Sequence, residues 1–347
     1  MSNQITDTVT YTAKEITYDF TNGLDALKEI LGVKSLHISF LAGDGSDRTY
    51  HRVTSEDSKP LAVIMKVSDS DNAKILKGTY EWCSISRLLN NEGLKAPKIL
   101  GAIPSVNALV IEDFGDLMLE SVVNKDPEAS TKLYESALQT IISMIGIQHN
   151  SAEVWTTRSF DIEKLSYELH FFKTHYLSTL ENIFKNPSEI QMFEKEVEDL
   201  SRYLAGYSKY FTHRDFHSRN IILASGEIGL IDFQDARLGP PSYDLVSLIY
   251  DPYVDLSFEQ RESLRVKFIY SFEESIIAEE VKSTYKAMAL QRILKAIGSF
   301  GYLTLTVKRG DYLKYVPKAL QLLKDIKVED ERWPFITKTL LARLEAI

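Results

Sequence analysis

The most constraining feature of this chain is the polar run Phe211-Thr-His-Arg-Asp-Phe-His-Ser-Arg-Asn220, followed by Ile231-Asp-Phe-Gln-Asp235. Asn220 comes five residues after Asp215, and Asp232 follows two further short apolar runs. Such spacing suits a strand–loop–strand segment that brings Asn220 and Asp232 to one place. Amide and carboxylate oxygens are the hard ligands that Mg²⁺ prefers. The joint pattern therefore predicts a magnesium site with a further carboxylate, that of Asp215, close by.

The same residues read H-R-D-x-x-x-x-N with a downstream D-F-x, a pattern typical of the catalytic loop of enzymes that transfer phosphoryl groups from MgATP. In this interpretation Asp215 accepts or orients the proton of an attacking hydroxyl, and Asn220 and Asp232 bind the metal ion. An alternative is a zinc site at the alternating His213, Asp215 and His217. The spacing of the five other histidines completes no such site, and zinc leaves Asn220 and Asp232 without a role. We therefore favour phosphoryl transfer.

Further upstream, a lysine lies inside a predicted buried strand, Leu61-Ala-Val-Ile-Met-Lys-Val67. An unpaired buried ammonium is very costly, so Lys66 needs a partner. A strand of this kind followed by a helix matches the V-A-I-K motif, whose lysine binds the α- and β-phosphates and a helix glutamate. Glu81 is the only acidic residue of the helix predicted over 73–91. The alternatives are a lysine that reaches solvent from an edge strand and a glutamate on a solvated helix surface.

A turn of small residues, G-D-G-S, separates strands predicted over 37–42 and 49–53. Glycine permits close approach, and successive N–H groups form a concavity that binds anions. We expect Gly43, Gly45 and Ser46 to cover the nucleotide phosphates. The alternative is an ordinary hairpin turn.

Four further polar residues lie in or near the catalytic loop. Asp244 begins an apolar helix, and we interpret it as structural, either capping the helix or holding the loop. Asp235 supports a metal or substrate, or makes a loop hydrogen bond. We expect His213 to be hydrogen-bonded within the loop, and His217 to line the acceptor site or simply to pack.

The order of the predicted elements indicates an α+β protein of two lobes. Five short strands with one interposed helix precede Glu112-Asp-Phe-Gly115, which looks like a connector, and mainly helices follow it. This is the plan of a protein-kinase-like fold. We expect an N-terminal nucleotide-binding lobe over 1–111, a hinge at 112–116, and a helical catalytic and substrate-binding lobe over 117–347.

Composition excludes several other classes. The net charge of −9 argues against a general nucleic-acid binder, which usually presents a basic surface. No apolar run approaches the roughly 18 residues of a membrane span, and no signal peptide is apparent at the N-terminus. The single cysteine, Cys83, cannot form an intrachain disulfide. We expect a cytoplasmic protein without nucleic-acid or membrane partners.

Taken together, these motifs resemble the aminoglycoside phosphotransferase family, the small-molecule branch of the protein-kinase fold. The loop reads H-R-D-F-H-S-R-N, and the metal motif is D-F-Q, without the glycine of D-F-G. More narrowly, the chain looks like the bacterial amino-sugar kinases that phosphorylate the anomeric hydroxyl of N-acetylmuramic acid and N-acetylglucosamine. The stretches Leu41–Tyr50, Ile231–Leu248 and Leu290–Gly298 carry this narrower likeness.

The resemblance implies an ATP- and Mg²⁺-dependent kinase of peptidoglycan recycling, acting on a small amino sugar as a monomer. It implies the roles already given for the catalytic carboxylate, the two metal ligands and the phosphate lysine: Asp215, Asn220, Asp232 and Lys66. It also implies that the backbone of Glu112 and Phe114 binds adenine. The alternatives are a kinase of the same fold for an aminoglycoside, choline, homoserine or a ketoamine, and a catalytically silent nucleotide-binding protein.

Overall fold

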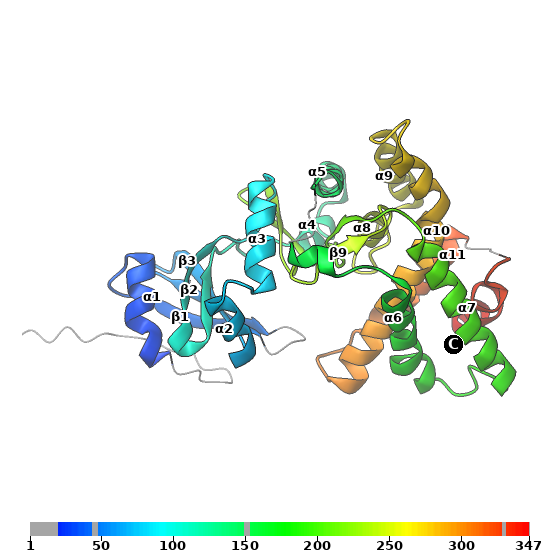
Figure 1. The fold of residues 1–347 in the computed structure, drawn as a ribbon, viewed down its shortest axis with the longest axis horizontal. Coiled ribbons are helices and arrows are strands. Elements are labelled where there is room, and N and C mark those ends of the chain that lie inside the picture. The colour runs from blue at the N-terminus through cyan, green and yellow to red at the C-terminus, as the bar shows by residue number, and fades with distance from the viewer. Residues whose placement is uncertain (1–19, 44–47, 149–152, 328–330, 347) are drawn as a thin grey trace, which may run out of the picture. The chain divides into compact units, whose positions relative to one another are not determined.

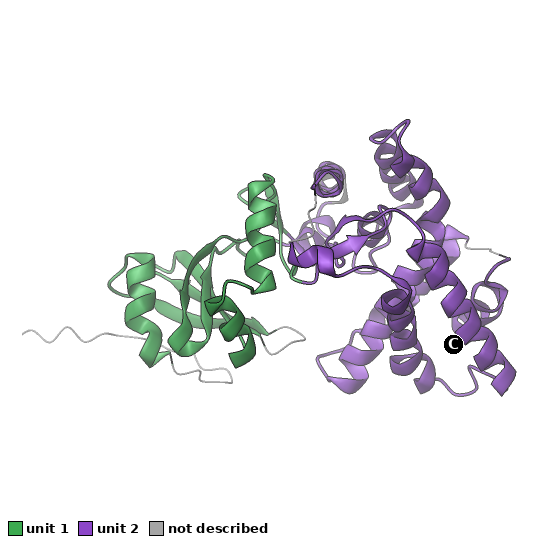
Figure 2. Cartoon of the chain, in the orientation of Figure 1, with its two compact units in different colours: residues 1–117, 222–234 green, residues 118–221, 235–347 purple. Residues whose placement is uncertain are grey.

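The protein was studied as a computed structural model (Figure 1), which describes the chain in the ranges 20–43, 48–148, 153–327 and 331–346. It divides into two compact units, one of residues 1–117 and 222–234, the other of residues 118–221 and 235–347 (Figure 2). The sequence-based division had set residues 112–116 apart as a hinge and had assigned 222–234 to the second lobe. In the structure both segments group with the first unit.

An antiparallel sheet of five strands, in the order β1-β2-β3-β5-β4, organises the first unit. Its strands are β1 (His37–Gly43), β2 (Thr49–Thr54), β3 (Pro60–Lys66), β4 (Ile99–Ile103) and β5 (Ala108–Ile111). The middle strand β3 is buried from Ala62 to its end, as its continuous apolar run predicts. Lys66 ends β3, opposite Thr49 of β2 and Ala108 of β5. The predicted strands are therefore confirmed, and they place a lysine in the interior of the sheet.

Three helices accompany this sheet: α1 (Leu24–Leu31), α2 (Asp69–Leu76) and α3 (Glu81–Asn91). Leu27 of α1 joins the apolar residues of the sheet in one core cluster. The single helix predicted over 73–91 is wrong, because the chain forms α2 and α3 in its place. Ser68 caps the start of α2, and Gly78, between the helices, has a φ of +72°, which an L side chain rarely adopts.

A hairpin from the later part of the chain completes the first unit. It consists of β7 (Ile221–Ala224) and β8 (Glu227–Leu230). Lys95 anchors it, with its ammonium 2.6 Å from the Glu227 carboxylate and 3.1 Å from the Ala224 carbonyl. The ring of Phe233 packs against Trp82 of α3 at 5.1 Å between centroids. These contacts hold the segment that carries Asp232.

The second unit is built around the long helix α10 (Ile276–Gly301), most of which is buried. It packs against α6 (Ile162–His175) and α8 (Tyr243–Ile249), and Figure 1 shows α10 beside α6. Gly298 permits this close approach, because a Cβ there would lie 2.6 Å from the Cα of Phe172. Two short strands, β6 (Tyr210–Thr212) and β9 (Arg237–Gly239), pair antiparallel.

Further helices surround this centre. They are α4 (Leu119–Val123), α5 (Pro127–Ile145), α7 (Pro187–Ala205), α9 (Phe258–Tyr270), α11 (Val316–Ile326) and α12 (Leu341–Glu345). The sequence predicted a mainly helical second lobe, and this prediction is confirmed. Within the described ranges, no helix combines the length and apolar character that a membrane crossing requires.

Candidate active site

The backbone of the catalytic loop, which follows β6, is held by a carboxylate from α8. Asp244 accepts the N–H of His213 at 2.7 Å and the N–H of Arg214 at 3.0 Å. Arg214 has a φ of +82°, a conformation that costs energy for a residue with a side chain. Burial raises the pKa of Asp244 to about 7, against the two N–H donors, which lower it. The prediction that Asp244 is structural and holds the loop is confirmed.

A second buried carboxylate, which sequence reasoning missed, holds the other half of the loop. Asp251 accepts the N–H of Ser218 at 2.8 Å and that of Tyr253 at 2.9 Å. Within the loop, the carbonyl of Asp215 accepts the N–H of His217 and the side-chain amide of Asn220, both at 3.0 Å. The positions of Asp215 and Asn220 are thus determined by buried hydrogen bonds.

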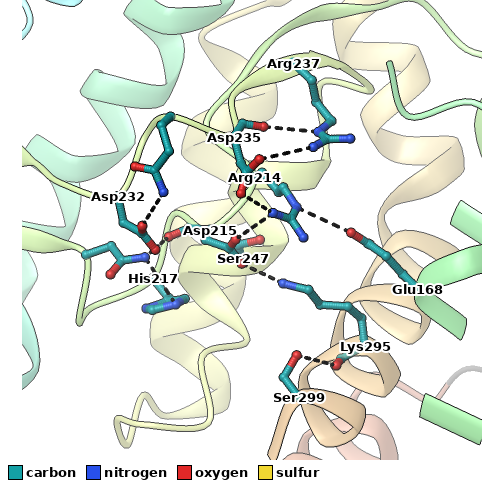
Figure 3. A network of polar contacts seen from close by, with 12 residues as sticks. Glu168, Arg214, Asp215, His217, Asp232, Asp235, Arg237, Ser247, Lys295 and Ser299 are labelled. Atoms are coloured by element: carbon teal, nitrogen blue, oxygen red, sulfur yellow. Dashed lines mark hydrogen bonds and ion pairs between the residues drawn. The ribbon is translucent and has the colours of Figure 1, made fainter. Parts of the chain in front are cut away.

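The carboxylate of Asp215 lies among cations (Figure 3). Its Oδ1 is 2.7 Å from Nζ of Lys295 and 3.3 Å from Nη2 of Arg292, both on α10. Its Oδ2 is 3.8 Å from Nη1 of Arg214, beyond hydrogen-bond distance. Burial alone would raise the pKa of Asp215, but the charges of Lys295, Arg214 and Arg292 outweigh it and hold this pKa well below its usual range. Asp215 is therefore ionised at neutral pH.

The cations around Asp215 are themselves held by two further carboxylates. Glu168, buried on α6, has its Oε1 3.5 Å from both Lys164 Nζ and Arg214 Nε. Its Oε2 accepts hydrogen bonds from Tyr243 at 3.3 Å and Gln291 at 3.1 Å. The sequence did not identify Glu168, because nothing local distinguishes it from a surface glutamate.

Asp235, for which the sequence left two roles open, forms ion pairs with three arginines. Its carboxylate lies 3.0 Å from Arg214, 3.8 Å from Arg158 and 3.8 Å from Arg237. Arg237 also donates to the Asp235 carbonyl at 3.1 Å. Asp235 thus makes loop contacts within the second unit, as one of the two interpretations had it.

Ion pairs around Asp215 join cations from several elements. Among the described residues they involve six cationic side chains: Arg158, Lys164, Arg214, Arg237, Arg292 and Lys295. The carboxylates that pair with them are Asp215, Glu168 and Asp235. The buried carboxylates Asp244 and Asp251 lie near the same groups. Cationic side chains of the loop and of α10 therefore contact Asp215 directly.

The two histidines of the loop are packed inside the second unit. The ring of His213 lies against Phe216 at 5.7 Å between centroids, and that of His217 against Tyr253 at 5.4 Å. Burial lowers the pKa of His217 to about 3, although the charge of Asp215 raises it, so His217 is neutral. Across the described ranges, no three His, Cys, Asp or Glu side chains gather where they could hold a metal ion. The zinc interpretation thus gains no support.

Arg219, next to Asn220, occupies an aromatic cluster beside the loop. Its guanidinium forms two hydrogen bonds with Glu120 of α4, at 2.9 and 2.7 Å, and a third with the Tyr315 hydroxyl at 2.6 Å. The same group lies 3.7 Å from the ring centroid of Tyr253, a cation–π contact. Arg219 therefore ties the loop to α4 and to the C-terminal region.

The two predicted metal ligands are described in different units. In the second unit, the hydrogen bond from the Asn220 amide nitrogen to Asp215 determines which end of that amide is the oxygen. In the first unit, Asp232 follows β8 with a φ of +60°, and its Oδ1 accepts a hydrogen bond from Gln234 at 2.7 Å. One amide oxygen and one carboxylate are a donor set that suits Mg²⁺, which usually takes one or two carboxylates and completes its shell with phosphates and water.

Lys66 is buried in the first unit, with 5% of its surface exposed. Its ammonium donates to the carbonyl of Val106. Burial lowers the pKa of Lys66 to about 8, although the charge of Asp69 raises it. Glu81 begins α3, and its carboxylate lies 3.5 Å from Lys74 Nζ. The pairing of Lys66 with Glu81 stays a prediction.

The other predicted nucleotide contacts are only partly within the described residues. Gly43 ends β1, whereas Gly45 and Ser46 lie outside the described ranges. Glu112 follows β5 and donates its N–H to the Lys98 carbonyl at 2.9 Å. The ring of Phe114 covers Gly229, where a Cβ would lie 2.8 Å from the ring.

Arg52 of β2 holds the segment around these residues, and sequence reasoning missed it. It forms an ion pair with Asp113 at 2.6 Å and another with Asp116 at 2.6 Å. The two aspartates flank Phe114 and Gly115, so Arg52 stabilises the stretch of first-unit backbone that was expected to bind adenine.

The chain has relatives among curated proteins. A protein of Neisseria meningitidis serogroup B, named N-acetylmuramate/N-acetylglucosamine kinase, is 26% identical over 312 residues, covering 86% of this chain and 88% of the relative. One of the same name from Caulobacter vibrioides is 22% identical over 308 residues, covering 80% of this chain and 84% of the relative.

Solved structures share the fold. The gentamicin complex of APH(2'')-IIa has a TM-score of 0.60 at 15% identity, covering 90% of this chain and 99% of that one. The choline kinase of Cryptosporidium parvum has a TM-score of 0.57 at 13% identity, covering 88% and 93%. The fold is thus protein-kinase-like. Residues 37–277 match the phosphotransferase enzyme family, and the chain belongs to this family of enzymes.

Proposed function

We propose that this phosphotransferase is a MgATP-dependent kinase that phosphorylates the anomeric hydroxyl of N-acetylmuramate or N-acetylglucosamine in peptidoglycan recycling. The relatives from Neisseria meningitidis and Caulobacter vibrioides carry this substrate pair in their names. Another protein of the same fold, APH(2'')-Ib, has been solved with ADP bound, which supports nucleotide use. The ionised Asp215 in its buried loop supports the acceptor role given to that residue.

The cations that contact Asp215 carry this proposal. An aminoglycoside is a polycation, and Lys295, Arg292 and Arg214 around the carboxylate oppose its approach. N-acetylmuramate carries a carboxylate on its lactyl group, and N-acetylglucosamine is neutral. The network therefore favours an anionic or neutral sugar and discriminates against cationic acceptors.

In the proposed reaction, the acceptor oxygen forms a bond to the γ-phosphorus as the bond from that phosphorus to the β,γ-bridging oxygen breaks. ADP leaves, and the hydroxyl proton passes to Asp215 and then to solvent. Phosphoryl transfer has a loose transition state, so the protein mainly positions groups and neutralises charge. Bound Mg²⁺ would neutralise phosphate charge, with Asn220 and Asp232 as its ligands.

The first unit is proposed to bind the nucleotide. Lys66 contacts the α- and β-phosphates with Glu81 as its helix partner, and Gly43, Gly45 and Ser46 cover the phosphates. The backbone of Glu112 and Phe114, in the segment that Arg52 holds, binds the adenine.

Choline is a weaker candidate, although kinases for it share the fold. Aromatic rings commonly recognise quaternary ammonium groups. The ring cluster beside this loop, however, contains Arg219, whose guanidinium lies 3.7 Å from the centroid of Tyr253 and is bound by Glu120. A choline headgroup would have to displace a bound cation.

The proposal is tested by measuring ADP release from MgATP with N-acetylmuramate, N-acetylglucosamine, glucose, choline and an aminoglycoside. We expect turnover with the N-acetylated sugars, and ³¹P NMR of the product locates the phosphate on the anomeric oxygen. The methyl ester of N-acetylmuramate is the matched control for charge, because it removes only the carboxylate. If the cations bind that carboxylate, the ester has a higher KM at similar kcat.

Two further outcomes separate the alternatives. Turnover with the aminoglycoside or choline alone would discard the amino-sugar assignment and keep the enzyme class. Chelation of Mg²⁺ by EDTA is expected to abolish ADP release, and excess Mg²⁺ is expected to restore it.

A further inference from the structure

The stretch Leu290–Gly298 lies on α10, beyond residue 277, where the family match ends. In the structure its polar residues contact the catalytic loop and α6. Gln291 binds Glu168 at 3.1 Å, while Arg292 and Lys295 contact Asp215 at 3.3 and 2.7 Å.

We propose that Lys295, assisted by Arg292, is a positioning residue that engages Oδ1 of Asp215 and so presents Oδ2 to the acceptor hydroxyl. The proposal rests on the role of Asp215 proposed above. It assigns different tasks to the two oxygens of one carboxylate. It also gives Arg292 and Lys295, which lie outside the family match, a role in the reaction.

The two oxygens of Asp215 have different surroundings. Oδ1 accepts hydrogen bonds from both α10 residues, whereas the nearest cation to Oδ2 is Arg214 Nη1, at 3.8 Å. A hydroxyl donor approaching Oδ2 would therefore displace no existing hydrogen bond. An approach to Oδ1 would compete with two charge-assisted bonds, which are among the stronger hydrogen bonds in proteins.

The α10 side chains are themselves held in place. Residues three apart on a helix lie on one face, so Arg292 and Lys295 reach Asp215 together. Arg292 donates from Nε to the Ser247 hydroxyl at 2.9 Å, and Ser247 in turn donates to the Tyr243 carbonyl at 2.9 Å. Both cations are buried, with 7% and 9% of their surfaces exposed. Their bonds to Asp215 are therefore poorly screened by water.

Titratable and charged groups from the loop and from three helices surround Asp215 and the cations that contact it. They are Arg214 and His217 of the loop, Lys164 and Glu168 of α6, Tyr243 and Asp244 of α8, and Arg292 and Lys295 of α10. His217 is neutral, and Lys164 and Glu168 form an ion pair. Lys295 exerts the largest of the charge effects that lower the pKa of Asp215.

The experiment compares wild-type enzyme with Lys295→Met and Lys295→Arg, measuring kcat, KM and their dependence on pH from 5.5 to 9. For Lys295→Met we expect kcat to fall about 10-fold at pH 7. The difference from wild type should shrink above pH 8, because burial lowers the pKa of Lys295 to about 8 and the wild-type enzyme then loses the same charge. KM for ATP stays unchanged. Lys295→Arg keeps a cation and restores most of kcat.

Lys173→Met is the matched control. Lys173 is a half-buried α6 lysine paired with Glu194, outside the Asp215 network. It should leave kcat and the pH profile as in wild type. A purely structural role for Lys295 would lower activity by the same factor at every pH once the folded fraction is normalised, and that result would overturn the proposal.

A second readout requires no turnover. Carboxyl ¹³C NMR at pH 7, with the Asp215 signal assigned by its loss in Asp215→Asn, reports the surroundings of this carboxylate. In Lys295→Met the signal should shift, because Oδ1 loses the 2.7 Å hydrogen bond from Lys295. An unchanged signal would overturn the inference about Lys295. A failure of the wild-type enzyme with every sugar would overturn the proposed function alone.

Discussion

Two buried lysines, Lys66 in the first unit and Lys295 in the second, share one property and differ in another. Each is nearly inaccessible, and burial lowers the pKa of each to about 8. Lys295 lies 2.7 Å from a carboxylate of its own chain, whereas the ammonium of Lys66 donates to the backbone carbonyl of Val106. The difference teaches that burial alone does not decide what a lysine contacts: one is paired with a carboxylate of the chain, and the other is proposed to bind a phosphate.

The two residues also differ in how visible they are in the sequence. Lys66 interrupts an apolar strand, so its charge stands out and points to a function. Lys295 lies on a long helix that carries several charges, and nothing local separates it from a surface lysine. Only the contact with Asp215, eighty positions away in the sequence, gives it a role.

Replacing Asp215, the partner of Lys295, should have the largest effect on kcat. Asp215→Asn keeps the shape of the side chain and abolishes its charge, and we expect kcat to fall by about 10²- to 10⁴-fold, as for loss of a general base. KM for ATP should change little, because the nucleotide contacts are assigned to the first unit. Steady-state kinetics test this. Retention of wild-type kcat would remove Asp215 from the mechanism.

The corresponding change in the first unit should act on the nucleotide. For Lys66→Met we expect kcat/KM for ATP to fall by roughly 10²-fold, since a charge-assisted contact with a phosphate is worth about 1.5–3 kcal/mol. Much of the loss should appear in KM for ATP. Isothermal titration with a non-hydrolysable ATP analogue measures the binding directly. Unaltered nucleotide affinity would contradict the role given to Lys66.

The pH dependence should separate the two lysines. A lysine is charged below its pKa, so a pKa of about 8 means that the charge is lost as pH rises through 8. The kcat profile reports the ternary complex, and kcat/KM for ATP reports the free enzyme. Lys295→Arg should therefore remove an alkaline decline in kcat, and Lys66→Arg one in kcat/KM. If Lys295→Arg removed the decline in kcat/KM and Lys66→Arg the decline in kcat, the two roles would have to be interchanged.

The close packing of α10 gives a smaller expected effect. A Cβ at Gly298 would lie 2.6 Å from the Cα of Phe172, and overpacking of this kind costs about 1–3 kcal/mol. We expect Gly298→Ala to lower the thermal midpoint and, because Lys295 lies one turn away, to lower kcat. Gly206→Ala is the control, since its nearest neighbour would be 3.5 Å away and its φ is −76°. Equal midpoints for the two variants would contradict the close contact.

The smallest effect is expected at an exposed lysine. Lys74 lies 3.1 Å from Asp71 and 3.5 Å from Glu81, and 44% of its side chain is accessible. Such pairs contribute at most about 1 kcal/mol, because water and salt screen them. Lys74→Met should leave kcat unaltered and shift the denaturation midpoint only slightly. A large loss of activity would indicate that Lys74, and not Lys66, contacts the nucleotide.

The sequence alone determined the features that depend on local spacing. Periodicity and apolar runs predicted the five strands and a mainly helical second lobe, and the spacing of Asp215 and Asn220 identified the loop. One local prediction was wrong, because the helix expected over 73–91 divides around Gly78, whose positive φ a sequence pattern does not reveal.

Only the tertiary structure decided how the loop is held and charged. Asp251, Glu168, Arg292 and Lys295 lie far from Asp215 in the chain, yet they form its surroundings or hold the loop. A charged residue on a helix is ordinarily solvated, and its sequence neighbours do not show whether packing will bury it. When packing does bury it, the cost of desolvation requires an opposite charge or a hydrogen bond, and only the fold determines which distant residue supplies it.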